Sequence, residues 1–136
     1  MVETLGKARP LSPHWQIWRW HATMAASILH RVTGLLLYLG LLVLTGWALA
    51  LAEGRTAFDG YAALLMSAPG LALLFLVTLS AFFHLANGIR HLAWDLGFGF
   101  RPKTADATAW VALGFGLLAT LAFWWRLSSL GVFHHG

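Results

Sequence analysis

Three long apolar segments dominate the pattern of hydrophobic and polar positions along this chain. They run from Ala22 to Ala52, from Pro69 to Trp94 and from Ala107 to Ser128. A membrane-spanning helix needs about 20 predominantly apolar residues, so each segment is long enough to cross a bilayer. None of them alternates between polar and apolar residues over the shorter length of a barrel strand. The pattern therefore predicts an all-α membrane protein with three transmembrane helices, arranged up-down-up.

Shorter and more polar segments surround these spans. We expect an N-terminal interfacial segment at 1–21, a three-helix transmembrane domain at 22–130 and a tail at 131–136. The first segment is rich in tryptophan, whose ring favours the headgroup layer. It is predicted to contain a short helix from Ser12 to His21.

The connectors between the spans contain residues that break helices. Glu53 to Ser67 and Gly97 to Asp106 both hold glycine and are interpreted as short loops. Pro69 suits the first turn of the second helix. Gly114 and Gly116 are expected to let the third span pack closely against a neighbour, because small residues allow helix backbones to approach.

Composition supports an integral membrane protein and narrows its chemistry. Hydrophobic residues make up 59% of the 136 residues and charged residues 10%, against about 25% charged in an ordinary soluble domain. The chain has no cysteine, which excludes cysteine-ligated iron–sulfur clusters and c-type haem attachment within it. The net charge of +4 does not indicate a nucleic-acid partner, because the basic residues form no continuous face.

The lysines and arginines are distributed unevenly about the spans. Of the nine, only Arg55 and Arg126 fall on the side reached after the first and third spans. The others lie before the first span, at its start or around the second connector. Because basic residues concentrate on the cytoplasmic side of a membrane, the N-terminus is predicted to be cytoplasmic.

A first polar cluster lies where the first span begins. It comprises Ser27, His30, Arg31, Thr33 and Gly34. Residues three and four apart share a helix face, so Ser27 neighbours His30 and Arg31. The glycine permits close approach of another backbone or a flat ligand. A polar pocket is therefore predicted, with simple contact of the basic pair with lipid headgroups as the alternative.

A second cluster lies in the second span. His84, Gly88, His91 and Asp95 follow one another at spacings that place them on one stripe of a helix. His84 lies about 10 Å along the axis from His91, at 1.5 Å per residue, and is therefore inside the hydrocarbon. An ionisable group at that depth normally faces a protein interior and has a partner.

Together the two clusters favour the binding of a b-type haem. The imidazole of His84 suits the iron in the apolar zone, whereas His30, Arg31 and His91 suit the propionates at the wet boundary. Antiparallel packing of the first two spans would bring both clusters to the same membrane face. No other histidine lies deep in a span, so a six-coordinate iron would need its second axial ligand from another subunit. The alternative is that His84 is structural and bonded to a neighbouring helix.

These residues resemble the two signatures of the cytochrome b membrane-anchor subunit of succinate dehydrogenase, complex II. The matching positions are Ser27-x-x-His30-Arg31-x-Thr33-Gly34 and His84-x-x-x-Gly88-x-Arg90-His91-Leu92-x-x-Asp95. The resemblance of motifs covers about Arg9 to Gly97.

The resemblance implies a role for each matched residue. His84 corresponds to the axial haem ligand, and Ser27 and Arg31 to residues that contact ubiquinone. His30 and Arg31 correspond to the haem-propionate region. Asp95 lies where the family has a residue linked to the quinone end of the bundle, with a role in quinone or proton chemistry.

The resemblance also implies partners and a location. The expected partners are a second small haem-ligating anchor subunit, an iron–sulfur subunit and a flavoprotein subunit. Succinate oxidation itself would occur in the flavoprotein, and this chain would help to pass the electrons to ubiquinone. The implied location is the bacterial inner membrane, with the mitochondrial inner membrane as the alternative.

Other functions stay open at this point. One is a non-haem membrane anchor or assembly scaffold, and another is an anchor of fumarate reductase. A proton or ion pathway through His84 and Asp95 is less favoured, because the third span offers few polar residues to continue a relay.

Overall fold

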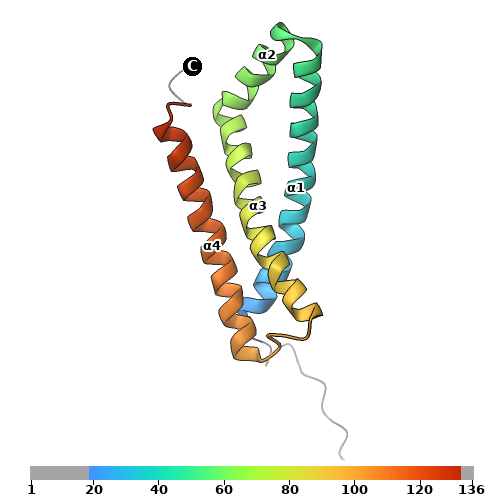
Figure 1. The fold of residues 1–136 in the computed structure, drawn as a ribbon, viewed down its shortest axis with the longest axis vertical. Coiled ribbons are helices and arrows are strands. Elements are labelled where there is room, and N and C mark those ends of the chain that lie inside the picture. The colour runs from blue at the N-terminus through green and yellow to red at the C-terminus, as the bar shows by residue number, and fades with distance from the viewer. Residues whose placement is uncertain (1–18, 133–136) are drawn as a thin grey trace, which may run out of the picture.

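The computed structural model describes residues 19–132, which form four helices (Figure 1). These are α1 (Ala22–Glu53), α2 (Arg55–Met66), α3 (Ala68–Asp95) and α4 (Pro102–Ser129). The helices α1, α3 and α4 are long and apolar enough to cross a membrane. They lie side by side with α3 between the other two, and successive spans run in opposite directions. The predicted architecture of three transmembrane helices is confirmed.

The connector between α1 and α3 is helical, so the prediction of a loop was wrong there. Gly54, with φ of 108°, separates α1 from α2. Within α2, the Arg55 guanidinium bonds both carboxylate oxygens of Asp59 at 3.0 and 2.9 Å, a spacing that stabilises a helix. The Tyr61 hydroxyl donates to the Val43 carbonyl at 2.8 Å and fastens α2 to α1. These contacts outweigh the glycines that suggested an irregular connection.

The start of α3 agrees with the sequence. Pro69 lies in the first turn, and Ser67 is the N-cap. The Ser67 hydroxyl accepts a hydrogen bond from the Gly70 N–H at 3.3 Å, which satisfies one of the free donors at a helix start. The start of α4 differs, because the helix begins at Pro102 and not near Ala107.

The predicted N-terminal helix, Ser12 to His21, falls mostly outside the described residues. Its last three positions, 19–21, are not helical. His21 is the N-cap of α1 and has an extended backbone, with φ of −116° and ψ of 144°.

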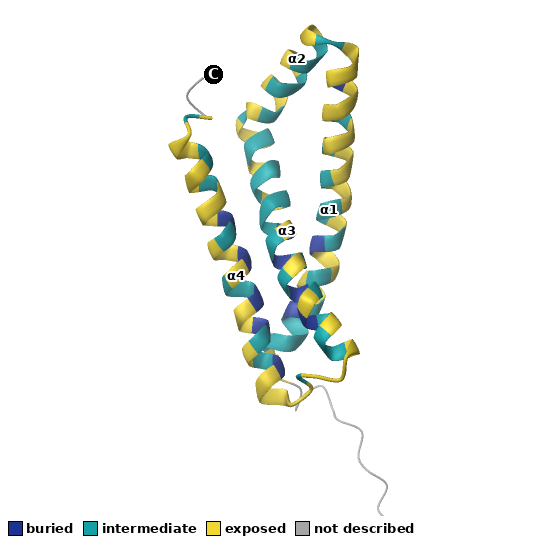
Figure 2. Ribbon diagram, in the orientation of Figure 1, coloured by how far each residue is buried: buried dark blue, intermediate teal, exposed yellow. Residues whose placement is uncertain are grey.

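The interior of the bundle is thin and consists largely of small side chains. Its central buried cluster draws on all three spans and contains Ala26, Phe83, Ala109 and Ala112. Figure 2 shows that the buried positions gather where α1, α3 and α4 converge, in the lower half of the view. Small residues are typical of helix contacts in membranes, where close backbone approach replaces the hydrophobic driving force.

The two glycines singled out in the third span differ in role. A Cβ atom at Gly116 would lie 2.8 Å from the Cβ atom of Phe83. Glycine is therefore required there for α4 to meet α3. Gly114 has no such neighbour within 4 Å, so the expectation of close packing is confirmed for Gly116 alone.

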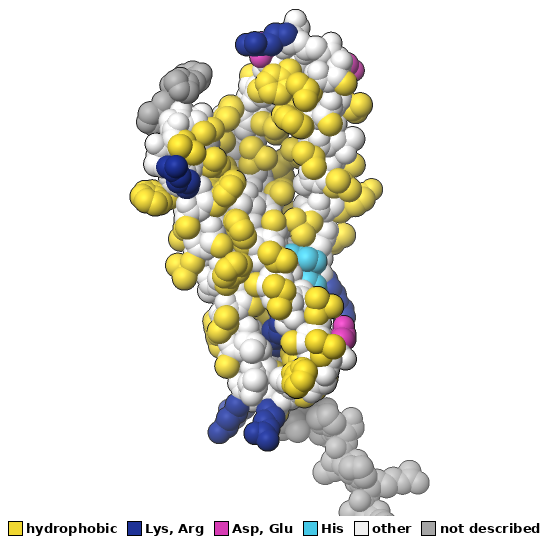
Figure 3. All heavy atoms as spheres, in the orientation of Figure 1, with side chains coloured by type: hydrophobic (Ala, Val, Ile, Leu, Met, Phe, Trp, Pro, Cys, Tyr) yellow, Lys and Arg dark blue, Asp and Glu magenta, His cyan; other side chains and the backbone are white. Residues whose placement is uncertain are grey.

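Apolar side chains cover the outside of the bundle. Figure 3 shows them spread over the drawn face, with lysine and arginine side chains lying mainly toward the ends. Leu35, Leu118 and Trp125 are among the large side chains that point outward. An apolar exterior of this kind suits contact with lipid tails or with other apolar helices.

Polar contacts tie the spans together at the lower end, which is the end where α1 and α4 begin and α3 ends (Figure 1). The carboxylate of Asp106 accepts hydrogen bonds from the backbone N–H and the hydroxyl of Thr23, at 3.1 and 2.7 Å. The guanidinium of Arg90 donates to the Ala105 carbonyl at 3.0 Å and to the Thr108 hydroxyl at 3.1 Å. The first pair joins α4 to α1, and the second set joins α3 to α4.

Candidate functional site

Three histidines meet between α1 and α3 toward the lower end. The rings of His30 and His84 are stacked, with centroids 3.7 Å apart and planes 18° from parallel. The His91 ring lies 5.0 Å from that of His30. The three side chains, called the histidine cluster below, come from segments more than 50 residues apart in the chain. The structure therefore brings together residues of the first and second predicted clusters.

Two glycines lie opposite the stacked rings, one on each helix. A Cβ atom at Gly34 of α1 would lie 3.4 Å from Cε1 of His84. A Cβ atom at Gly88 of α3 would lie 3.9 Å from Cε1 of His30. Each histidine thus lies over a glycine of the opposite helix. Both separations are ordinary van der Waals distances, so the arrangement is reciprocal without requiring glycine at either position.

The nitrogen atoms of the histidine cluster are only partly satisfied. Nδ1 of His84 lies 3.1 Å from the Thr33 hydroxyl oxygen. Within residues 19–132, no hydrogen bond reaches Nε2 of His84. In the same range Nδ1 of His30 is buried and has no hydrogen-bond partner. Buried polar atoms are normally paired, so the missing partner of this nitrogen is unusual.

The histidine cluster lies near an open face of the bundle. All three side chains are partly exposed, and Figure 3 shows histidine side chains at the surface, over α1 and α3. Of the three spans, α1 is the least buried by the rest of the protein. Only 6% of its most hydrophobic 18-residue stretch is buried, against 22% for the corresponding stretch of α4. A polar nitrogen at membrane depth is costly beside lipid. The face is therefore suited to being covered by a ligand, another chain or both.

Arg31 follows His30 on α1, and Asp95 lies one helical turn after His91 at the end of α3. Both side chains are exposed. In the part of the chain that the structure describes, neither forms a hydrogen bond or ion pair with another residue. They are free to interact with groups outside the chain.

Ser27 lies beside a cavity that is separate from the histidine cluster. Its hydroxyl donates to the Thr23 carbonyl at 3.0 Å. It borders a cavity of about 480 Å³ at the lower end, lined also by residues of α4 and of the segment before it. The further lining residues are His21, Thr23, Met24, Phe100, Pro102, Ala105 and Asp106. Ser27 therefore borders this cavity, whereas His30, one turn further along α1, belongs to the histidine cluster.

Arg90 does not join the histidine cluster, although it is adjacent to His91 in sequence. It is buried, bonds to Asn87 at 3.2 Å as well as to α4, and has its guanidinium 4.0 Å from the centre of the Trp94 ring. It therefore acts as a link between α3 and α4.

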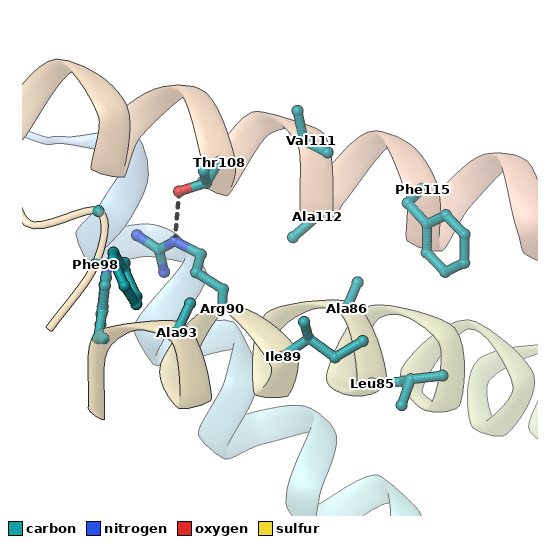
Figure 4. A pocket seen from close by; sticks show the side chains of 12 residues that line it. Leu85, Ala86, Ile89, Arg90, Ala93, Phe98, Thr108, Val111, Ala112 and Phe115 are labelled. Carbon is teal, nitrogen blue, oxygen red and sulfur yellow. Dashed lines mark hydrogen bonds between the residues drawn. The ribbon is translucent and has the colours of Figure 1, made fainter. Parts of the chain in front are cut away.

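An apolar groove of about 440 Å³ runs between α3 and α4 next to this arginine. Figure 4 shows aliphatic side chains of α3 and α4 around it, with the hydrogen bond from Arg90 to Thr108 at one end. Its α3 residues Ala86 and Ala93 each follow a histidine of the cluster by two positions, which is about 200° around a helix. The groove therefore lies on the side of α3 away from the histidine cluster.

Sequence reasoning missed the roles of Thr33 and Asp106. Thr33 stands in the first motif but received no function, although a hydroxyl three residues after His30 could have been noticed on the same face. Asp106 ends the connector predicted from Gly97 to Asp106. Nothing local in the sequence indicates its contact with Thr23, because the two residues are 83 positions apart.

The fold and the site together define a class of protein. It is a small helical membrane subunit with an imidazole cluster between two spans and an open face beside that cluster. Comparison with known proteins agrees: residues 6–123 match the family described as succinate dehydrogenase/fumarate reductase transmembrane subunit. The chain belongs to this family, as a cytochrome b anchor subunit of complex II.

Individual relatives give the same result. The chain is 35% identical over 116 residues to the succinate dehydrogenase cytochrome b556 subunit of Rickettsia felis, covering 85% of this chain and 90% of the relative. It is 41% identical over 124 residues to the mitochondrial succinate dehydrogenase cytochrome b560 subunit of Homo sapiens, covering 88% and 72%. A relative from Reclinomonas americana, also a cytochrome b560 subunit, is 36% identical over 121 residues.

Proposed function

We propose that this chain binds haem b together with a partner anchor subunit and forms part of the ubiquinone-reduction site of succinate dehydrogenase. The observation that carries the proposal is the position and hydrogen bonding of the His84 imidazole. Its ring lies between two spans about 16 Å before the end of α3, at 1.5 Å per residue. Nδ1 is held by Thr33, and no hydrogen bond from residues 19–132 reaches Nε2.

The donor set fits a haem better than a bare metal ion. Within residues 19–132, no three histidine, cysteine, aspartate or glutamate side chains are arranged to hold a metal ion. A single imidazole suits an iron that already has four ligands from a macrocycle. When bound, the haem supplies a one-electron couple between ferric and ferrous iron.

The remaining histidines and Arg31 suit the acidic edge of such a group. The buried Nδ1 of His30 has no partner, and His91 lies next to it, nearer to the end of α3. Arg31 is exposed beside them. Carboxylates form short, strong hydrogen bonds with arginine and protonated histidine. We assign the propionates to His30, Arg31 and His91.

The second axial ligand would come from a partner. A helix of another subunit can lie at this position, because the face beside the histidine cluster is open. The small buried fraction of α1 supports the same arrangement. The cytochrome names of the relatives support a haem in this family. We therefore include a second haem-ligating anchor subunit among the partners, with the iron–sulfur and flavoprotein subunits beyond it.

Ser27 and Arg31 are the residues proposed for quinone. A serine hydroxyl can donate to a quinone carbonyl, and a guanidinium can stabilise negative charge that develops on the oxygen during reduction. The cavity at Ser27 is open at the lower end, where an electron-donating subunit can reach it. Asp95, exposed at the end of α3, is assigned to proton supply at the same end.

The orientation and location follow from charge and from the relatives. The basic residues of the lower end predict a cytoplasmic or matrix position for that end. Relatives from bacteria and mitochondria support the inner membrane as the location. In this orientation both Ser27 and Arg31 face the compartment that contains the soluble subunits.

A spectrum of the purified, intact complex tests the proposal directly. The expected result is a b-type reduced-minus-oxidised spectrum with Soret and α bands, together with succinate-dependent reduction of ubiquinone. A fully assembled complex without these bands would overturn haem binding and favour a non-haem anchor. The reverse assay, with reduced quinone and fumarate, separates a dehydrogenase from a fumarate reductase.

A further inference from the structure

The hydroxyl group of Thr33 makes three short contacts at the interface of α1 and α3. Its oxygen lies 2.8 Å from the Leu29 carbonyl oxygen, 3.0 Å from that of His30 and 3.1 Å from Nδ1 of His84. The side chain is buried, at 9% exposure. Two of these contacts are within α1, whereas the third crosses to α3.

The chemistry of these contacts assigns a direction to the bond between the helices. A threonine hydroxyl has one proton, and backbone carbonyl oxygens can only accept. The two carbonyls of α1 thus take that proton, and the shorter contact is the one to Leu29. The Thr33 oxygen is then an acceptor for a proton on Nδ1 of His84. With Nδ1 protonated, the neutral imidazole has its lone pair on Nε2.

A second residue of α1 also contacts the His84 ring. The ring of His30 covers one face at a centroid distance of 3.7 Å. Thr33 and the His30 ring therefore hold His84 from α1, and the bond to Nδ1 restricts rotation of the imidazole.

We infer that Thr33 is a positioning residue for the iron ligand. It fixes the tautomer and the rotation of His84 so that Nε2 presents a lone pair to haem iron, and it makes that nitrogen more basic. The inference rests on the proposed function, in which His84 is a ligand. Loss of such a supporting hydrogen bond typically costs about 10–100-fold in metal affinity.

Paired substitutions in the intact complex test this role. Thr33→Val keeps the shape of the side chain but removes the hydroxyl, and Thr33→Ser keeps the hydroxyl. Thr78→Val is the matched control, because the Thr78 hydroxyl also bonds a carbonyl of its own helix, at 2.7 Å to Leu74, but contacts no histidine.

The readouts are haem retention and reduction potential, not turnover. We expect Thr33→Val to release haem to an excess of apomyoglobin at least about tenfold faster than the unsubstituted complex. Its midpoint potential should be higher, because a less basic imidazole stabilises ferric iron less. Thr33→Ser and Thr78→Val should behave like the unsubstituted complex.

Comparison with His84→Ala separates failure of the inference from failure of the proposed function. If His84→Ala removes the haem while Thr33→Val leaves release rate and potential unchanged, Thr33 has no positioning role and the ligand assignment stands. If His84→Ala retains an unaltered haem, the proposed function fails and the inference fails with it.

A measurement without substitution covers the case in which Thr33→Val does not assemble. The ferrous low-spin complex is suited to NMR of ¹⁵N-labelled histidine. A proton on Nδ1 of the ligand histidine, with hydrogen exchange slowed by a bond, supports the inference. An Nδ1 without a proton, or one that exchanges freely, overturns it.

Discussion

The carboxylate of Asp106 caps the first turn of another helix, through Thr23. It accepts from the Thr23 backbone N–H at 3.1 Å and from its hydroxyl at 2.7 Å. The N-cap residue of α1, His21, makes no capping bond with its own side chain, so the acceptor comes from α4 instead. A negative charge at a helix N-terminus also interacts favourably with the helix dipole. This contact closes the bundle beside the cavity of Ser27.

Replacing Asp106 should loosen the lower end of the bundle. We expect Asp106→Asn to lower the thermal midpoint of the detergent-solubilised complex, because an uncharged amide is a weaker acceptor for both Thr23 donors. Differential scanning fluorimetry measures the shift. Asp59→Asn is the control, since Asp59 forms an exposed ion pair at the other end and should change the midpoint less. Equal shifts for the two variants would argue against a specific capping role.

His84→Ala should remove the haem without preventing insertion into the membrane. The imidazole is the ligand in the proposed site, whereas the spans depend on apolar length alone. The pyridine haemochrome spectrum, normalised to flavin, gives the haem content. His21→Ala, which changes a histidine outside the histidine cluster, should keep the full content. A normal spectrum in His84→Ala would contradict the assignment.

Ser27→Ala and Arg31→Ala should impair quinone reduction selectively. Loss of one hydrogen bond worth about 1 kcal/mol lowers the rate roughly five- to tenfold, and loss of the guanidinium should cost more because it acts on developing charge. Succinate oxidation with a soluble artificial acceptor should stay near the unsubstituted level. Ser27→Thr, which keeps a hydroxyl, should retain more activity than Ser27→Ala. A parallel loss of both activities would indicate failed assembly instead.

Arg90→Met should destabilise the contact between α3 and α4. The substitution removes the hydrogen bonds to Thr108, Asn87 and the Ala105 carbonyl. These polar groups then remain inside the bundle without the guanidinium. We expect a loss of about 1–3 kcal/mol in unfolding free energy, measured by denaturation in mixed micelles. Arg126→Met, at an exposed position near the end of α4, is the matched control. Similar stability in both variants would show that Arg90 is not a structural link.

Much of the architecture could be predicted from local properties of the chain. The three spans follow from apolar length, and the predicted limits of the first two lie within one residue of α1 and α3. The placing of His84, Gly88, His91 and Asp95 on one stripe follows from helical periodicity. In contrast, α2 was not predicted because Gly54 and Gly60 suggested a loop. The contact of α2 with α1 through Tyr61 is a tertiary interaction.

The sequence alone determined how many helices cross the membrane and which polar residues share a face of each, because both depend on spacing along one continuous helix. Only the tertiary structure decided how those helices are rotated against one another. That rotation places Thr33 on His84, turns Arg90 toward α4 and brings Asp106 to Thr23. The physical reason is that contacts between helices, such as that of Gly116 with Phe83, set the points of closest approach. The periodicity of a single helix contains no information about which partner will lie there.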